Sequence, residues 1–271
     1  MTDDLSLLAD GELTLYGQIP SASNLTLVCE VSAAGRTERC VYKPVRGEQP
    51  LWDFPDGTLA GREVASYLID AALGWDLIPP TVLRPHGPDE AELGPGMLQL
   101  WVHAPDDPEE FEPVELVPAD QVPDGYRPIL HALDDDGAVV ALAHAGDSRL
   151  HTMAVLDAVL NNADRKGGHI LPGADGRSYA IDHGICLHTE PKLRTVLWGW
   201  AGEPIDPALL SDLAGLAERL APGAADGLRD RLAAHITAAE IDAVAQRARE
   251  LVRTGVLPEP PAHRAIPWPP F

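Results

Sequence analysis

The strongest constraint on the fold is a change in the hydrophobic period along the chain. In residues 24–31, apolar side chains occupy every second position, namely Leu25, Leu27, Cys29 and Val31. This period is typical of a half-buried β-strand, and strands are predicted throughout residues 12–44. Further strands are predicted at 80–84 and 96–102, and a helix that ends at Gly74 is predicted at 58–74.

The second half of the chain shows mainly helical periodicity. Residues 149–163 carry an apolar helical stripe, and short strands are predicted at 169–171 and 178–182. Two later helices have recognisable starts, marked by Asp206 with Pro207 and by the capping box of Thr237 with Glu240. The pattern predicts an α+β protein with a β-rich first lobe and a mainly helical second lobe.

Composition divides the chain into four segments. Residues 103–127 are acidic and rich in proline, which predicts a surface insertion or a connection between lobes. Residues 257–271 are again rich in proline and show no regular period. We therefore expect a β-rich lobe, an acidic connection, a helical lobe and a tail, at residues 1–102, 103–127, 128–256 and 257–271.

The net charge limits the classes of partner. The chain has 20 Lys and Arg against 42 Asp and Glu, a formal net charge of −22. Such a surface repels phosphate backbones and anionic headgroups, so we expect neither nucleic acid nor stable membrane binding. Three features predict a cytoplasmic protein. The cysteines are scattered without a CxxC pair, the start is acidic and lacks a basic leader region, and no apolar stretch reaches 18 residues.

Four charged residues stand at positions that often carry catalytic side chains. Lys43 ends a predicted strand, with Val41 on the same face, and Glu63 lies on the next helix, away from its main apolar stripe. Asp164 follows the apolar helix in NNADRKGGHIL, which also carries His169, and Asp182 ends the strand in YAIDHG. Taken singly, Lys43 and Glu63 are better explained as an ordinary strand-end lysine and a solvated helix glutamate. The loop of Asp164 is equally well explained as a capped helix end, and Asp182 has the alternative of a turn aspartate.

The order of the four residues is more informative than any one of them. In phosphoryl transfer a lysine orients the nucleotide phosphates, a glutamate fixes the lysine, one aspartate activates the acceptor, and another holds Mg²⁺. Lys43, Glu63, Asp164 and Asp182 occur in that order. The sequence therefore predicts a two-lobe protein-kinase-like fold that uses ATP and a divalent metal.

Several blocks of sequence also carry a family resemblance. CVYKPVRGEQP, GMLQLWV, LDAVLNNADRKGGHIL and AIDHGICLH, in this order, resemble the phosphatidylinositol 3-/4-kinase-like superfamily, most closely the type II phosphatidylinositol 4-kinases. The chain is also similar to an actinobacterial family of predicted kinases. The resemblance runs from about Gly17 to Trp200.

The resemblance implies a role for each matched residue. Lys43 would contact the phosphates with support from Glu63, Asp164 would be the catalytic aspartate, and Asp182 would bind the metal. The hinge that meets adenine would be formed by Gln99, Leu100, Trp101 and Val102, with Val41 capping the base. The nucleotide-covering loop would supply Ser21, Ser23 and Asn24.

The chain departs from this family at two points. His169 stands where the family has an asparagine that binds a second metal ion. Because Mg²⁺ prefers oxygen ligands, His169 either favours Mn²⁺, contacts phosphate, or marks the loss of that second metal. The family's cysteine-rich membrane loop has no counterpart between Pro44 and Arg62, so we expect a soluble acceptor rather than a membrane lipid.

Four functions are consistent with these observations. The first is an ATP-dependent phosphotransferase acting on a protein Ser/Thr, on itself, or on a small molecule. The others are a nucleotide-binding regulatory pseudokinase, a phosphatidylinositol kinase, and a metalloenzyme built from the histidines of the second half, namely His131, His144, His151, His169, His183 and His188. Trp198 and Trp200 either wall an acceptor pocket or, as is more common, belong to the core.

Overall fold

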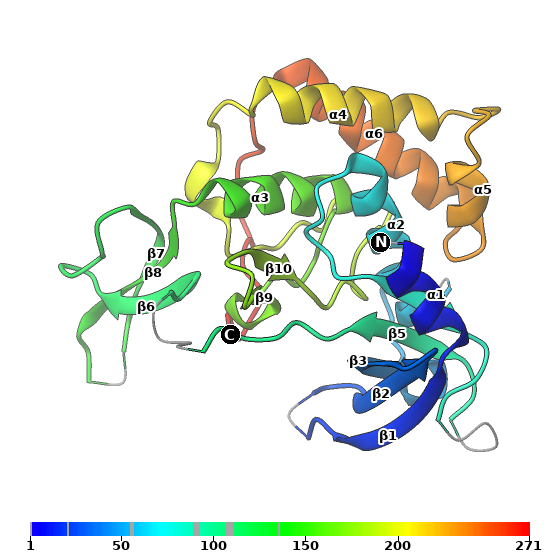
Figure 1. Ribbon diagram of the computed structural model, residues 1–271. Coiled ribbons are helices and arrows are strands. Elements are labelled where there is room, and N and C mark those ends of the chain that lie inside the picture. Colours follow the sequence, from blue (N-terminus) through cyan, green and yellow to red (C-terminus); the bar gives the residue numbers. More distant parts are fainter. Residues whose placement is uncertain (1, 21, 55–56, 89–92, 107–110, 135) are drawn as a thin grey trace.

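The first lobe is built on one antiparallel sheet (Figure 1). The computed structural model describes residues 2–20, 22–54, 57–88, 93–106, 111–134 and 136–271. The sheet has the order β1-β2-β3-β5-β4, and its strands are β1 (Glu12–Gln18), β2 (Leu27–Ala33), β3 (Arg36–Pro44), β4 (Thr81–Arg84) and β5 (Gly96–Leu100). The predicted strands in this half are confirmed.

Two helices pack against this sheet, and only one of them was predicted. Helix α2 (Leu59–Leu73) begins where the Thr58 hydroxyl accepts a hydrogen bond from the Gly61 amide, and it ends at Gly74, whose φ of 73° is left-handed. Helix α1 (Thr2–Asp10) was not predicted. It buries only Leu7 and Leu8 into the core under the sheet, which is too short an apolar stripe to indicate a helix from sequence.

A second sheet begins in the segment that was predicted to be a surface insertion or a connection between the lobes. Strands β6 (Val114–Pro118), β7 (Tyr126–Leu133) and β8 (Val139–Ala145) form an antiparallel sheet of order β6-β8-β7 (Figure 1). Residues 103–127 were expected to be a surface insertion or a connection, without strands of their own, but β6 lies within them and β7 begins in them. The strands were missed because few β6 and β7 side chains are buried, so alternation is weak, and because prolines interrupt the pattern.

The remaining part of the second lobe is helical, as expected. Its elements are α3 (Ser148–Leu160), α4 (Pro207–Arg219), α5 (Leu228–Ala233) and α6 (Ala238–Thr254), with the short strands β9 (Ile170–Pro172) and β10 (Ser178–Ala180), and the single-turn helices η3 (Gly167–His169) and η4 (Trp198–Trp200). Asp206 caps α4, and the Thr237–Glu240 capping box of α6 is complete. No helix of the described chain is long and apolar enough to cross a membrane.

One arginine joins the two lobes. Arg62 of α2 is buried, and its guanidinium donates to the Cys186 carbonyl at 2.8 Å and to Glu240 Oε1 at 2.5 Å. Glu240 is also the capping residue of α6. Helix α2 is therefore held against the helical lobe as well as against its own sheet. This fixes the position of its side chains relative to both lobes. The α+β architecture with a β-rich lobe and a helical lobe is confirmed.

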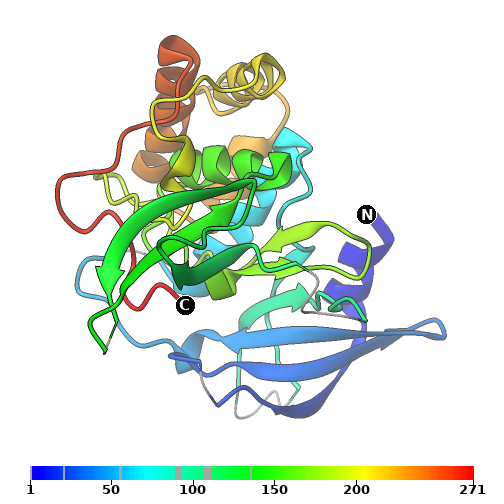
Figure 2. The same ribbon diagram turned by 90° about the vertical axis from the view of Figure 1, so that its left-hand side faces the viewer.

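The tail has neither helix nor strand in residues 258–271, yet it is anchored. The Ala265 carbonyl accepts hydrogen bonds from the Thr195 amide at 3.1 Å and from Trp198 Nε1 at 2.7 Å. The Pro270 carbonyl accepts from the Gly167 amide at 2.8 Å. The tail thus passes along the helical lobe and ends beside β6 and β9 (Figure 2). Trp198 and Trp200 are both buried, as core residues are.

A buried histidine ties β8 to η4 and makes the fold sensitive to acid. His144 Nε2 accepts a hydrogen bond from the Gly199 amide at 3.0 Å, which leaves Nδ1 to donate to the Ala145 carbonyl at 2.9 Å. Burial lowers the pKa of His144 to about 4. Below about pH 6.5 the unfolded chain therefore binds a proton at this residue that the folded chain does not bind, and stability falls as the pH falls.

We predict that the free energy of unfolding decreases by about 2 kcal/mol between pH 7 and pH 5 through His144 alone. Replacing His144 with Gln removes this titration, so the variant should lose less stability on acidification than the wild type. Urea unfolding at the two pH values measures the difference. The exposed His131 provides the control: His131→Gln should keep the wild-type acid sensitivity. Equal acid sensitivity of all three proteins would contradict the prediction.

Candidate active site

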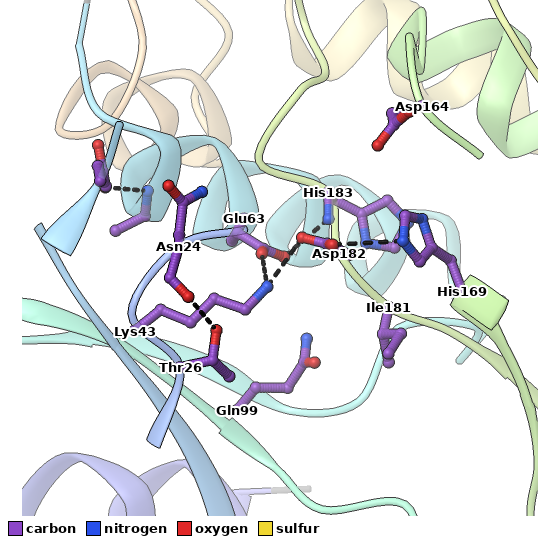
Figure 3. Close-up of polar contacts among 12 residues, drawn as sticks. Asn24, Thr26, Lys43, Glu63, Gln99, Asp164, His169, Ile181, Asp182 and His183 are labelled. Atoms are coloured by element: carbon purple, nitrogen blue, oxygen red, sulfur yellow. Dashed lines mark hydrogen bonds and ion pairs between the residues drawn. The ribbon is translucent and has the colours of Figure 1, made fainter. Parts of the chain in front are cut away.

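Lys43 lies between two carboxylates that come from distant parts of the chain. Its Nζ is 2.7 Å from Glu63 Oε1 on α2 and 2.8 Å from Asp182 Oδ1, which follows β10 (Figure 3). The sheet supplies the lysine, the helix supplies the glutamate, and the second lobe supplies the aspartate. The predicted association of Lys43 with Glu63 is therefore present, and Asp182 joins it.

Glu63 is a buried part of the site rather than a solvated helix residue. Its side chain is only 3% exposed, and its second carboxylate oxygen accepts a hydrogen bond from the His183 amide at 2.8 Å. Glu63 thus holds both the lysine and the backbone that follows Asp182. Asp182 itself has a φ of 62°, and its carboxylate is 46% exposed. A left-handed backbone at a non-glycine residue is uncommon and is found more often at functional sites.

The charges of this cluster stabilise one another. Burial opposes the charged form of Lys43, but the adjacent carboxylates of Asp182 and Glu63 outweigh it and raise the pKa of the lysine. Lys43 in turn lowers the pKa of Asp182. Lysine and aspartate are therefore both charged at neutral pH, as groups that bind phosphate and a metal cation must be.

Asp164 stands on the loop after α3, apart from the lysine cluster (Figure 3). Burial raises its pKa, and Lys166 Nζ lies 3.5 Å from its Oδ2. The Asn162 side chain accepts a hydrogen bond from the Asp164 amide at 2.9 Å, which fixes the backbone. Asp164 and Asp182 thus come from two loops of the same lobe, and a partly buried carboxylate beside a lysine is suited to accept a proton.

A cleft of about 690 Å³ opens beside Lys43 and Asp182, and Asp164 is not among its lining residues. This volume is within the range of small-molecule sites. It is lined from the sheet side by Val41, Lys43, Gln99, Leu100, Trp101 and Val102, and from the helical lobe by Ile181 and Asp182 among others. Within the described chain, the backbone N–H and C=O of Val102 make no hydrogen bond. All the residues predicted for the lysine strand and the hinge therefore line one cavity.

The predicted nucleotide-covering loop lines the cleft with residues other than the expected ones. Ser21 lies outside the described residues. Asn24 Oδ1 accepts a hydrogen bond from the Gln49 amide, and the Ser23 carbonyl accepts one from the Gln49 side chain. These bonds shape the loop itself, whereas the described members of the loop region that line the cleft are Ile19, Ala22 and Thr26.

The predicted metal ligands face each other. His169 Nε2 lies 3.4 Å from Asp182 Oδ2, and burial lowers the pKa of His169 to about 4, so the ring is neutral at pH 7. An exposed carboxylate beside the cleft fits a divalent cation that is shared with a phosphate group. Among the described residues, no group of three or more His, Cys, Asp or Glu side chains converges to hold a metal. The histidine-rich second half therefore offers no support for a metalloenzyme site there.

Phe271 also lines the cleft, and no sequence pattern indicated it. Its ring packs on the loop after Asp164: a Cβ atom built on Gly167 would lie 2.7 Å from Phe271 Cε1 and 3.2 Å from Val114 Cβ. The ring is 50% exposed and leaves the cleft open. No local period marks such a residue, because its position depends on the path of the whole tail.

Comparison with known proteins shows a close relative. The chain is 54% identical to Protein Rv2133c of Mycobacterium tuberculosis (strain ATCC 25618 / H37Rv) over 275 residues, which cover 99% of this chain and 96% of the relative. The chain belongs to the Rv2133c family. No family model matches it.

The fold of this Rv2133c-family chain is also found among solved structures. The crystal structure of the Golgi casein kinase superposes with a TM-score of 0.55 at 13% sequence identity, covering 93% of this chain and 73% of the kinase. At this identity the likeness concerns the fold alone. The predicted kinase-like fold is confirmed, whereas the specific likeness to phosphatidylinositol 3-/4-kinases stays a prediction.

The packing of Phe271 can be tested with two neighbouring glycines. We predict that Gly167→Ala displaces the ring and loosens the hydrogen bond from residue 167 to the Pro270 carbonyl, so that this amide exchanges hydrogen faster. A Cβ atom built on Gly168 would meet no described atom within 4 Å, so Gly168→Ala should leave the exchange unchanged. Hydrogen exchange followed by NMR gives the rates. Equal protection of residue 167 in both variants would show that the ring does not pack there.

Proposed function

We propose that this chain is an ATP-dependent kinase. The observation that carries the proposal is the placement of Lys43 between Glu63 and Asp182, at 2.7 and 2.8 Å, on the wall of a nucleotide-sized cleft. The kinase-like fold supports it, because this cluster lies between a β-rich lobe and a helical lobe. The identities of Lys, Glu and the two Asp residues match the parts of phosphoryl-transfer sites.

In this mechanism Lys43 binds the phosphates of ATP. The phosphates replace Asp182 as the second partner of the lysine, while Glu63 keeps the ammonium group in position. Asp182, with His169 beside it, would hold Mg²⁺ or Mn²⁺. The bound metal would neutralise charge on the phosphates. Adenine would lie between Val41 and the hinge, where the Val102 backbone has a free donor and acceptor.

Asp164 acts on the acceptor. Its carboxylate orients an acceptor hydroxyl and accepts the hydroxyl proton as the new oxygen–phosphorus bond forms and the bond from the β–γ bridging oxygen to the γ-phosphorus breaks. The products are the phosphorylated acceptor and ADP. Lys166, 3.5 Å from Asp164, adds positive charge near the transferred group. This charge favours the transition state over the ground state.

The type of kinase, its acceptor and its compartment are also part of the proposal. The ordered motifs favour a kinase of the phosphatidylinositol 3-/4-kinase-like type, acting in the cytoplasm on a soluble acceptor, either a protein Ser/Thr or a small molecule. The net charge of −22 is unfavourable for an anionic lipid surface. Three free, buried cysteines suit a reducing compartment.

We predict that ATP with Mg²⁺ or Mn²⁺ raises the melting temperature of the wild type. A ligand at about 100 times its Kd stabilises the folded state by about 2.7 kcal/mol. Asp182→Asn should lose most of this stabilisation, because the cation loses its carboxylate ligand. The matched control is Asp175→Asn on the exposed turn between β9 and β10, which should respond like the wild type. If neither metal gives a shift with ATP in the wild type, the kinase proposal is wrong.

We further predict that Asp164→Asn separates binding from transfer. The variant should keep the ATP-dependent stabilisation, since Asp164 does not contact the Lys43 cluster, but phosphate transfer to itself or to an acceptor should fall by about 10²-fold or more. Transfer is followed with γ-labelled ATP against a library of soluble acceptors. Full transfer activity in Asp164→Asn would exclude this residue as the base. ATP binding without transfer in the wild type would favour a regulatory pseudokinase.

A further inference from the structure

A second large cavity lies in the helical lobe. Its volume is about 650 Å³, close to that of the cleft, and it is enclosed by α6, the segment 189–198 and tail residues 258–264. It shares no lining residue with the cleft beside Lys43. A cavity of this size can enclose a small organic molecule.

The charge of this cavity is opposite to that of the chain. Its lining includes four Lys and Arg residues and two Glu residues, namely Lys192, Arg194, Arg247, Arg264, Glu250 and Glu259. The whole chain has 20 Lys and Arg against 42 Asp and Glu. Cations are therefore gathered here in a protein that otherwise carries mostly carboxylates, and such a gathering attracts an anion.

Two of the cations form no direct ion pair within the described chain, although burial raises the pKa of the nearby Asp164 carboxyl and Arg194 acts to lower it. Within the described chain, the guanidinium groups of Arg194 and Arg264 make neither a hydrogen bond nor an ion pair. Lys192, by contrast, pairs with Asp53 at 3.2 Å, and the carboxylate of Glu250 is neutralised by Arg253. Among the described lining residues, Arg194 and Arg264 are thus cations without an ion pair, and Glu259 is a carboxylate without one. The two arginines come from neighbouring segments, because the Thr195 amide donates to the Ala265 carbonyl at 3.1 Å.

Arg247 adds a half-buried positive charge to the wall formed by α6. Its Nε donates to the Val159 carbonyl at 2.7 Å and its Nη1 to the His188 carbonyl at 3.1 Å, while its Nη2 is buried without a hydrogen-bond partner in the described chain. Burial lowers its pKa to about 10, which still leaves the group charged at neutral pH. A charge that has no direct ion pair is stabilised further when an anion binds nearby.

The rest of the lining is largely apolar, with the polar residues Asn161, Thr189, Gln246 and His263 among it. The apolar walls are formed by Leu193, Trp198, Leu251, Pro258 and Pro261, together with two alanines. An inorganic ion would leave these walls uncovered, whereas an organic body carrying an anionic group would cover them and reach the arginines.

We propose that this cavity binds a small soluble organic anion, with a phosphate, sulfonate or carboxylate group held by Arg194 and Arg264 and an apolar body against Trp198 and Leu193. The proposal does not depend on the kinase function. The site does adjoin the candidate catalytic loop, because the Arg194 amide donates to the Asn162 carbonyl at 2.8 Å and the Arg165 amide donates to the Arg194 carbonyl at 3.1 Å.

The test uses two fluorescent probes that differ only in charge. 8-Anilinonaphthalene-1-sulfonate carries an anionic group, and N-phenyl-1-naphthylamine is the same ring system without it. The full chain should bind the sulfonate more tightly than the neutral probe. In the double variant Arg194→Gln/Arg264→Gln, the affinity for the sulfonate should fall about 10-fold or more, with little change for the neutral probe. Thermal unfolding verifies that each variant is folded.

Two further variants locate the binding. Arg249→Gln removes a positive charge from α6 outside the cavity and should bind both probes like the wild type. Ala243→Trp fills the cavity from α6 and should weaken both probes. The proposal is overturned if the two probes bind the wild type equally, if the double variant keeps its affinity for the sulfonate, or if Ala243→Trp leaves binding unchanged.

Discussion

A buried ion pair between Asp157 and Arg165 determines how the candidate active site is built. Both side chains are completely buried, and the guanidinium meets the carboxylate through Nε at 3.1 Å and Nη2 at 2.9 Å. The same carboxylate accepts hydrogen bonds from Asn162 Nδ2 and Thr195 Oγ1, and Arg165 Nη1 donates to the Ile181 carbonyl at 3.0 Å. One pair thereby fixes the end of α3, both functional loops and the segment after them. A buried charge is tolerated only when it is satisfied in this way.

The buried pair fixes the backbone at the two candidate aspartates. Asp164 directly precedes Arg165, and Asp182 directly follows the Ile181 carbonyl that Arg165 holds. Their backbones are therefore fixed while their carboxylates stay partly exposed, at 25% and 46%. Catalytic groups need rigid support of this kind, because small displacements of the reacting atoms reduce the reaction rate. Lys43 then provides the positive charge that keeps Asp182 ionised in a strongly acidic chain.

The parts of the site that could be predicted are those with a local signal. The Lys43 strand, the Glu63 helix and the Thr237 cap follow from period and capping residues, which depend on neighbours in sequence. The burial of Arg165 could not be predicted, since an arginine in a polar loop has the same sequence signal whether it is solvated or buried. The sheet of β6, β7 and β8 was missed because few side chains of β6 and β7 are buried, so their alternation is weak. The bonds of Asn24 and the position of Phe271 likewise depend on contacts made across the fold.

The tail illustrates how a segment without regular structure takes part in two cavities. Its carbonyls are not used in a helix or a sheet, so those of Ala265 and Pro270 are available to Thr195, Trp198 and Gly167. These bonds set the path that brings Arg264 to the cationic cavity and Phe271 to the cleft. The left-handed φ of 54° at Arg264 marks the point where the chain turns between them. The tail therefore lines both cavities through different residues, 258–264 at one and Phe271 at the other.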